Sequence, residues 1–314
     1  MPQFTIQSCL NTGTKKLLRK KLIRSTVNLD SELLLSHILN KPREYILTHP
    51  EKIVSRKQKD LFFRYIQRRM MYEPVAYIIG KKEFYGRDFF VDKNVLIPRG
   101  ATELLVEETL KYIYKLQATS HNLNIADIGT GSGCIAVTLA KELESPLTRR
   151  AATFPPLGRR VGGEGVSIYA VDISKKALGV AKKNAKVHNA KIMFHRGNLL
   201  EPLKNFEIDI LVANLPYLNF KEKNNYKRIL KHEPRQALYA KNNGLEYYQK
   251  LFRQIHQYKM FPGLLACEIL PKQRSEFKKI ATRILPHYKS KFIQNAAIVK
   301  KERFRGEEAP LEKK

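Results

Sequence analysis

Cysteine is scarce in this chain of 314 residues: Cys9, Cys134 and Cys267 form an odd, widely spaced set without a C-x-x-C pair. That spacing argues against a disulfide framework and against a zinc knuckle. It suits a reducing compartment, so we expect a cytoplasmic protein. The eight histidines show no H-E-x-x-H motif or other ligand spacing, and we therefore expect no metal site.

Long apolar runs and acidic residues are also lacking. No apolar run approaches the ~20 residues of a membrane-spanning helix, so we expect no membrane partner. The chain has only 29 Asp and Glu residues but 58 Lys and Arg residues, which gives a formal net charge of +29. The excess is spread along the chain and leaves two interpretations open. One is a lysine-rich, solvated surface, and the other is a partner that is acidic or carries phosphates, such as RNA or the ribosome.

The first 28 residues are basic and contain no acidic residue, as a mitochondrial transit peptide would. Residues 14–22, however, already have a helical pattern that leads directly into the next helix. We therefore expect this segment to be part of the folded protein.

The chain is long enough for two domains, and its patterning changes along its length. Apolar residues at helical spacing over residues 29–39 and 55–71 predict a small helical bundle within residues 1–74. Short aromatic and β-branched runs punctuated by glycine predict a β-ribbon linker over residues 75–94. From about residue 95 to 314, strands and helices alternate, which indicates an α/β domain with a mostly parallel sheet.

Residues 144–166 break this alternation, because they are rich in proline, glycine and arginine and have no periodicity that could be buried. We interpret them as a flexible surface insertion. A basic finger that contacts RNA is the alternative.

A glycine-rich turn follows a short apolar strand and directly precedes a helix. Its residues are Asp127, Ile128, Gly129, Thr130, Gly131, Ser132 and Gly133. Glycines permit the positive φ angles and the close backbone approach of such a turn. The dinucleotide fingerprint G-x-G-x-x-G is not met, since Cys134 stands where its third glycine would fall. Asp127 is placed to meet the cationic methionine end of S-adenosylmethionine, and the helix amino terminus suits the cofactor's carboxylate.

Asp172 ends the next predicted strand and can accept hydrogen bonds from both ribose hydroxyls of the cofactor. It lies about 40 residues beyond the glycines, farther than the usual ~20. Removal of the insertion at 144–166 restores the normal interval. The two elements in register predict a cofactor site.

A third motif, Asn214-Leu215-Pro216-Tyr217, follows a buried strand at its carboxyl end, where open α/β sheets bind ligands. The nitrogen of a side-chain amide or of a base amino group attacks poorly, because its lone pair is delocalised. The Asn214 side-chain oxygen and the Leu215 carbonyl can each accept one N–H, and Tyr217 offers a flat face for the planar group. The motif predicts methyl transfer to a planar nitrogen without a metal or general base, although N-x-P-Y also occurs as an ordinary turn.

With these motifs in place, the chain resembles the bacterial release-factor glutamine methyltransferases, the HemK or PrmC family, from about residue 17 to 272. The segments that carry the resemblance are residues 30–35, 73–80, 84–86, 96–99 and 102–107, the glycine turn, residues 214–217 and residues 233–238. The bundle and the β-ribbon separate this family from other methyltransferases.

The resemblance implies a Rossmann-like class I methyltransferase domain with a mostly parallel seven-stranded sheet, preceded by the bundle as a substrate-recognition domain. It also implies methylation of the glutamine in the Gly-Gly-Gln loop of peptide chain release factors, with S-adenosylmethionine as cofactor. Affinity for RNA or the ribosome would then be incidental to the charge. Asn198 and Leu199 would lie on the adenine side of the cofactor, and Asn214 would touch both ligands. Asn214, Leu215, Pro216 and Tyr217 would hold the glutamine, with Pro98 and Arg99 lining the site.

The chain departs from the family pattern in four places. Leu215 replaces the first of two prolines in the loop, which puts its rigidity in doubt. Gly100 and Ala101 replace a proline and an acidic residue. Asn198 replaces an aspartate and keeps an acceptor without the charge. Leu270 replaces a glycine after the matching Glu268.

Two other functions remain open at this point. An RNA or DNA amino-methyltransferase would use a similar Asn-Pro-Pro-Tyr loop, and the basic charge suits nucleic acid. A cofactor-binding interaction protein that no longer catalyses would explain the substituted motifs. The bundle, which contains no recognisable nucleic-acid module, argues against the first, and the intact Asn214, Pro216 and Tyr217 argue against the second.

Overall fold

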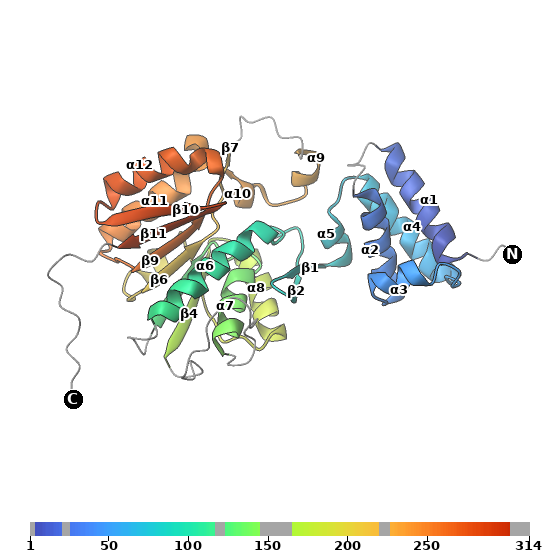
Figure 1. Ribbon diagram of the computed structural model, residues 1–314, viewed down its shortest axis with the longest axis horizontal. Helices are drawn as coiled ribbons and strands as arrows, with labels where there is room; N and C mark the ends of the chain where they lie inside the picture. Colours follow the sequence, from blue (N-terminus) through green and yellow to red (C-terminus); the bar gives the residue numbers. More distant parts are fainter. Residues whose placement is uncertain (1–3, 21–25, 117–122, 145–164, 220–226, 302–314) are drawn as a thin grey trace. The chain divides into compact units, whose positions relative to one another are not determined.

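The computed structural model describes residues 4–20, 26–116, 123–144, 165–219 and 227–301. The chain divides into two compact units (Figure 1). The helical unit comprises Met1–Lys82, Val91–Lys93 and Lys223–Pro234, and the sheet unit comprises Glu83–Phe90, Asn94–Glu222 and Arg235–Lys314. The insertion predicted at 144–166 lies almost entirely outside the described residues.

The described residues of the amino-terminal stretch form five helices: α1 (Ile6–Arg19), α2 (Val27–Leu39), α3 (Arg43–Thr48), α4 (Arg56–Met70) and α5 (Val75–Ile79). The helices predicted at 29–39 and 55–71 are confirmed, and Ser55 caps α4 through a capping box with Gln58. The helix expected at 14–22 begins earlier, at Ile6, because Thr5 and Ser8 form a second capping box there.

The segment Val75–Ile79, expected as a strand of the ribbon, is a helix instead. Pro74 precedes it with a φ of −58°, which is already suited to a helical start, and Gly80 ends it in the left-handed region at a φ of 78°. Five residues are too few for periodicity to separate strand from helix. The two-stranded ribbon itself consists of β1 (Lys81–Phe84) and β2 (Arg87–Phe90).

The described core of the helical unit is mostly apolar, and it contains a buried ion pair. Its fully buried side chains include Leu17, Leu34, Leu35, Ile46, Phe62 and Ile66. Between α2 and α4, Arg69 donates from Nε to Asp30 Oδ2 at 2.8 Å, and the two residues are 5% and 7% exposed. Because water cannot replace either partner, this pair holds the two helices in register.

Replacing Asp30 with alanine is expected to destabilise the helical unit by about 3 kcal/mol or more, because the Arg69 charge would stay buried without its partner. Hydrogen exchange of the α2 and α4 amides in the full-length protein measures the loss. Glu32→Ala is the matched control on the same helix. Glu32 pairs with Arg43, whose side chain is 44% exposed, so that loss should stay below about 1 kcal/mol. Equal losses in the two variants would contradict the prediction.

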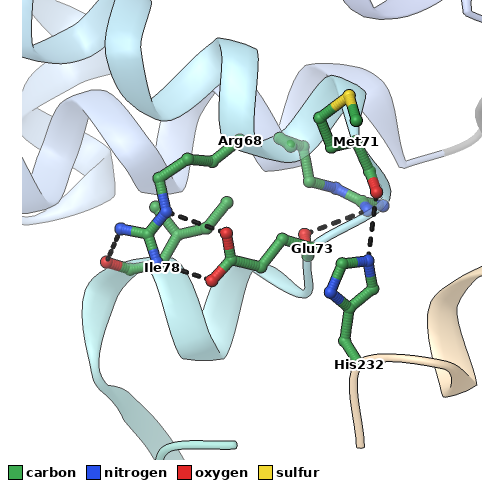
Figure 2. Close-up of polar contacts among 6 residues, drawn as sticks. Arg68, Met71, Glu73, Ile78 and His232 are labelled. Carbon is green, nitrogen blue, oxygen red and sulfur yellow. Dashed lines mark hydrogen bonds and ion pairs between the residues drawn. The ribbon is translucent and has the colours of Figure 1, made fainter.

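A distant stretch of sequence completes the helical unit. The residues around the short helix α9 (Lys227–Leu230) lie against the corner between α4 and α5. There Arg228 donates to the Tyr72 hydroxyl at 2.9 Å. His232 Nε2 donates to the Met71 carbonyl at 3.0 Å (Figure 2). Glu73 fixes this corner by accepting two hydrogen bonds from the Arg68 guanidinium (Figure 2). From the sequence we assigned residues 223–234 to the carboxyl-terminal domain, because these side-chain contacts leave no periodic signal.

Within the described residues, the main sheet of the sheet unit has seven strands in the order β10-β11-β9-β6-β3-β4-β5. They are β3 (Leu123–Ile128), β4 (Val166–Asp172), β5 (Met193–Arg196), β6 (Ile210–Ala213), β9 (Leu264–Glu268), β10 (Tyr288–Ile293) and β11 (Ala296–Lys301). Five neighbours from β9 to β5 run parallel, and β11 pairs antiparallel with both β9 and β10. The predicted mostly parallel, seven-stranded sheet is confirmed.

Alternate residues of the central strands enter two different cores, one on each face of the sheet. On one face lie α6 (Gly100–Leu116), α7 (Cys134–Glu144) and α8 (Lys175–Val187), and on the other lie α11 (Glu246–Gln257) and α12 (Arg274–Ile284) (Figure 1). Ile210 and Val212 point to the first group, whereas Leu211 and Ala213 point to the second. None of the helices in the described part of the chain is long and apolar enough to span a bilayer.

Shorter elements connect these layers at the carboxyl edge of the sheet. They are η1 (Glu201–Leu203), β7 (Leu218–Asn219), α10 (Arg235–Leu238), β8 (Tyr239–Ala240), η2 (Asn242–Gly244) and η3 (Pro271–Gln273). The strands β7 and β8 pair in parallel, which brings Leu218 and Asn219 next to Tyr239 and Ala240.

Candidate functional site

Strand register brings the predicted site residues to one edge of the sheet. Ile128 pairs with Ala213, and Ala213 pairs with Cys267, so β3, β6 and β9 end side by side. The residues that follow these strand ends are therefore neighbours: the glycine turn after β3, Asn214 after β6, and Glu268 at the end of β9. This is the edge at which open parallel sheets bind their ligands.

The glycine turn adopts the conformation that its composition predicts. Gly129, Gly131 and Gly133 have φ angles of 76°, 55° and 81°. A Cβ on Gly133 would approach the Cβ of Ala181 to 3.1 Å, so this glycine allows α8 to pack closely. A Cβ on Gly131 would meet only the Gly129 carbonyl oxygen, at 3.9 Å. The backbone at Gly131 is thus open to a ligand.

Asp127 is completely buried behind this turn. Its Oδ2 accepts hydrogen bonds from the Thr130 hydroxyl at 2.6 Å and the Ala136 amide at 3.2 Å. Among the described residues, Oδ1 of the same carboxyl group has no hydrogen-bond partner. Burial raises the pKa of Asp127 to about 7. An unpaired, buried acceptor of this kind fits a cationic ligand group.

Asp172 lies at the end of β4, beside the same turn. Its two carboxylate oxygens accept the amides of Gly131 at 2.9 Å and Ser174 at 2.8 Å. A carboxylate has about four lone-pair sites, so two remain for further donors. Burial raises the pKa of Asp172, while the two backbone hydrogen bonds lower it. Asp172 is thereby fixed with acceptors to spare.

The turn after β5 is held in an unusual conformation. Leu199 has a positive φ of 56° and is 8% exposed. Gln254, on α11, accepts the Leu200 amide at 2.8 Å and donates to the Asn198 carbonyl at 3.3 Å. The Asn198 side chain donates to Glu201 at 3.3 Å. The turn after β5 is therefore fixed, because Gln254 on α11 holds its backbone through two hydrogen bonds.

The loop of residues 214–217, which we call the NLPY loop, packs directly against the glycine turn. A Cβ on Gly129 would approach Leu215 Cδ2 to 3.0 Å, and Leu215 is 3% exposed. The leucine that replaces the family's proline also supplies a backbone N–H, which donates to the Tyr248 hydroxyl at 3.3 Å. The hydroxyl in turn donates to the Glu268 carbonyl at 2.5 Å. These contacts restrain the loop where the proline ring is missing.

The other end of the NLPY loop is held by Tyr217. Its hydroxyl donates to Glu268 Oε1 at 2.9 Å, and its carbonyl accepts from Gln273 Nε2 at 2.9 Å. Burial, together with the negative charge of Glu268, raises the pKa of Tyr217, so the phenol stays protonated. Asn214 donates from Nδ2 to the Thr102 hydroxyl at 3.0 Å.

Pro98 and Arg99 precede α6, the helix that carries Thr102. Pro98 is buried and Arg99 is partly exposed. The Arg99 charge lowers the pKa of both Glu268 and Tyr217, although burial outweighs it in each case. The structure thus brings all the predicted cofactor, loop and lining residues to the same edge of the sheet unit.

Four residues that brace the site were not identified from the sequence. They are polar side chains on packed helices: Asn184, Tyr248, Gln254 and Gln273. Asn184, 1% exposed, donates to the Ser132 carbonyl at 2.8 Å and so supports the glycine turn. A polar residue on an otherwise apolar helix face is the only sequence signal, and it does not say which loop the side chain reaches.

Comparison with known proteins agrees with this geometry. A family model described as PrmC N-terminal domain matches residues 9–80, and one described as Methyltransferase domain matches residues 119–268. The release factor glutamine methyltransferase of Coxiella burnetii (strain RSA 493 / Nine Mile phase I) is 35% identical over 247 residues. The match covers 78% of this chain and 80% of that protein. The chain belongs to the release factor glutamine methyltransferase family.

This family member also matches longer proteins. The bifunctional methyltransferase of Rickettsia bellii (strain RML369-C) is 31% identical over 303 residues, which cover 88% of this chain and 50% of that protein. The chain spans about half the length of the bifunctional relatives it matches.

A solved structure supports the fold of this family member. The catalytic domain of hMettl16, in complex with MAT2A 3′UTR hairpin 1, is similar at a TM-score of 0.51 and 15% identity, over 86% of this chain and 92% of that one. At this identity the likeness concerns the fold alone. With the methyltransferase-domain match, it confirms the predicted Rossmann-like class I methyltransferase fold.

Proposed function

We propose that this chain methylates the side-chain amide nitrogen of the glutamine in the Gly-Gly-Gln loop of peptide chain release factors, with S-adenosylmethionine as methyl donor. The observation that carries the proposal is the packing of the NLPY loop on the glycine turn, where Leu215 Cδ2 lies 3.0 Å from the position of a Cβ on Gly129. A ligand on the turn and a ligand on the loop would then be neighbours. Family membership supports this choice of substrate.

The residues present fit the cofactor. The unpaired Oδ1 of Asp127 suits its ammonium group, and the remaining lone pairs of Asp172 suit its ribose hydroxyls. Gly129, Thr130, Gly131, Ser132 and Gly133 would line it, and the backbone at Gly131 is open to it. Asn198 and Leu199 would border its adenine. When bound, S-adenosylmethionine supplies an electrophilic methyl group on a positively charged sulfur.

The chain's own part in the reaction is to orient the glutamine. The Asn214 side-chain oxygen and the Leu215 carbonyl each accept one N–H of the substrate amide, which pins the nitrogen. Tyr217 offers its ring face to the planar amide. Pro216, between Leu215 and Tyr217, restricts the backbone conformation of the loop. Pro98 and Arg99 line the approach. As the nitrogen becomes tetrahedral, its hydrogen bonds to both acceptors become stronger, and this lowers the barrier to methyl transfer.

The decisive experiment incubates the purified protein with radiolabelled S-adenosylmethionine and either a release factor or its Gly-Gly-Gln variant with alanine in place of glutamine. We expect label in the first and none in the second, with mass spectrometry placing the methyl group on the glutamine. Ribosomal RNA and DNA serve as competing substrates. Label that enters nucleic acid, or enters the alanine variant equally, would support an amino-methyltransferase acting on nucleic acid instead.

Affinity for the cofactor product S-adenosylhomocysteine should depend on pH through Asp127. Its pKa is about 7, so below pH 7 the carboxyl group is mostly protonated. It must lose that proton before it can pair with the ammonium group of the ligand. We expect roughly tenfold weaker binding at pH 6 than at pH 8, since one proton must leave. Calorimetric titration measures this, and Asp127→Asn should bind weakly with little pH dependence. A flat profile in the wild type would refute the assignment.

We further propose that the protein acts in the cytoplasm, where release factors work. The three free, buried cysteines suit that reducing compartment. The helical unit would recognise the release factor, and the net charge of +29 would add an incidental affinity for ribosomal RNA.

A further inference from the structure

A buried carboxylate lies behind the NLPY loop. It interacts with the loop through the Tyr217 hydroxyl and the Asn214 side chain, and it also accepts from Thr102 on α6. Glu268 is 2% exposed. Its Oε2 accepts from the Thr102 hydroxyl at 2.6 Å, and its Oε1 accepts from the Tyr217 hydroxyl at 2.9 Å. Thr102 is also 2% exposed, so water does not compete for either oxygen. Burial raises the pKa of Glu268, while these two hydroxyl donors, Asn214 and Arg99 lower it.

The direction of one proton follows from these contacts. A threonine hydroxyl has a single proton, and an ionised Glu268, which has none to donate, accepts it in the shorter bond. The Thr102 oxygen can then only accept from Asn214, which lies 3.0 Å away. Asn214 must turn Nδ2 toward Thr102. Its side-chain oxygen consequently faces away from the buried network.

We propose that Glu268 is a positioning residue for the methyl transfer. Through the Thr102 hydroxyl and its own interaction with Asn214 it sets which way the Asn214 amide faces, and through Tyr217 it holds the aromatic ring of the loop. This inference rests on the proposed function, because it needs a substrate N–H that the Asn214 oxygen accepts. With the amide turned over, Asn214 would present an NH2 group to the NH2 group of the substrate. Two donors would then face each other and the contact would be lost.

Substitution of Thr102 tests the proposal without altering the buried charge. Thr102→Val should lower kcat for the release factor about thirtyfold or more, because the Asn214 amide loses the Thr102 acceptor and only Glu268 is left to orient it. Thr102→Ser keeps the hydroxyl and should stay within about threefold of the wild type. Thr109→Val is the matched control, since Thr109 is fully buried on the same helix and only donates to the Leu105 carbonyl at 2.8 Å. Its kcat should stay within about twofold, a purely structural effect.

Glu268→Gln should reverse the orientation. Glutamine can donate from Nε2 to the Thr102 oxygen, which directs the threonine proton to Asn214 and favours the turned amide. We expect kcat to fall about a hundredfold, while the dissociation constant for S-adenosylhomocysteine stays within about twofold. If Glu268→Gln fails to fold, the two Thr102 variants and the Thr109→Val control still test the proposal.

Nuclear magnetic resonance reads the orientation without any methyl acceptor. The Asn214 side-chain NH2 signals, assigned by their loss in Asn214→Asp, should be preserved in Thr102→Ser and shifted in Thr102→Val and Glu268→Gln. Unchanged signals in Glu268→Gln, or equal kcat in Thr102→Val and Thr109→Val, would overturn the inference. If instead the wild type transfers no methyl group to release factor, the proposed function fails, and the NH2 signals still test the hold on Asn214.

Discussion

Replacing Asn214 with alanine is expected to lower kcat for release factor methylation about a thousandfold. The side chain is one of the two acceptors that pin the poorly nucleophilic amide, and loss of one such contact in a preorganised site costs 10²–10³ in rate. Misplacement of the nitrogen relative to the methyl group adds to that loss. Single-turnover transfer of label from S-adenosylmethionine measures the effect.

Cofactor affinity separates this role from a general loss of structure. Asn214→Ala should bind S-adenosylhomocysteine within about threefold of the wild type, because Asp127, Asp172 and the glycine turn are untouched. Asn205→Ala is the matched control, since Asn205 is exposed and precedes β6, at the opposite end of the strand. That variant should keep full activity. Unchanged turnover in Asn214→Ala would show that the loop does not orient the substrate.

Gly244→Ala is expected to displace the NLPY loop by a collision with its last residue, Tyr217. Gly244 has a φ of 86°, and a Cβ there would collide with the carbonyl group of Tyr217 and with Gln273. Because the Tyr217 carbonyl belongs to backbone, the loop itself must move. A displacement near 1 Å costs about a hundredfold in rate, and we also expect a stability loss of about 1–3 kcal/mol from the positive φ.

The control for this substitution is Gly179→Ala. Gly179 is exposed on α8, and a Cβ there meets no atom within 4 Å. Alanine should therefore raise the free energy of unfolding by about 0.5–1 kcal/mol and leave kcat within twofold. Denaturant titration and steady-state kinetics of the two variants provide the comparison. A Gly244→Ala enzyme with normal kcat would contradict the view that Gly244 supports the loop.

The alternation of strands and helices was predictable because the period of apolar residues differs between the two. The glycine turn, β4 and β6 were located correctly from strands that are short, apolar and followed by a glycine or a polar residue. The helix α5 was missed, because Val75–Ile79 fits both periods and only Pro74 and Gly80 determine its ends. Short segments take their conformation from their neighbours more than from their own residues.

The site was predictable only as far as it lies in continuous motifs. Asp127, Asp172 and Asn214 each follow an apolar strand, so their place at the sheet edge could be inferred. Thr102 and Glu268 stood in matching segments, but nothing in the sequence connects them to Asn214, since their contacts span 112 residues and 166 residues of chain. Side-chain hydrogen bonds over such separations depend on the register of the strands, which appears only in the folded protein.

The chain passes between the two units several times, at residues 82–83, 90–91, 93–94 and 234–235, and once more between Asn219 and Lys227. Dissection at any single peptide bond therefore cannot yield two complete fragments. A fragment that begins at residue 94 would keep residues 223–234 but lose the surface at Met71 and Tyr72 on which His232 and Arg228 rest. Domain exchange with a relative should transplant residues 223–234 together with the first 93 residues, and chimaeras joined at one point alone should fold poorly.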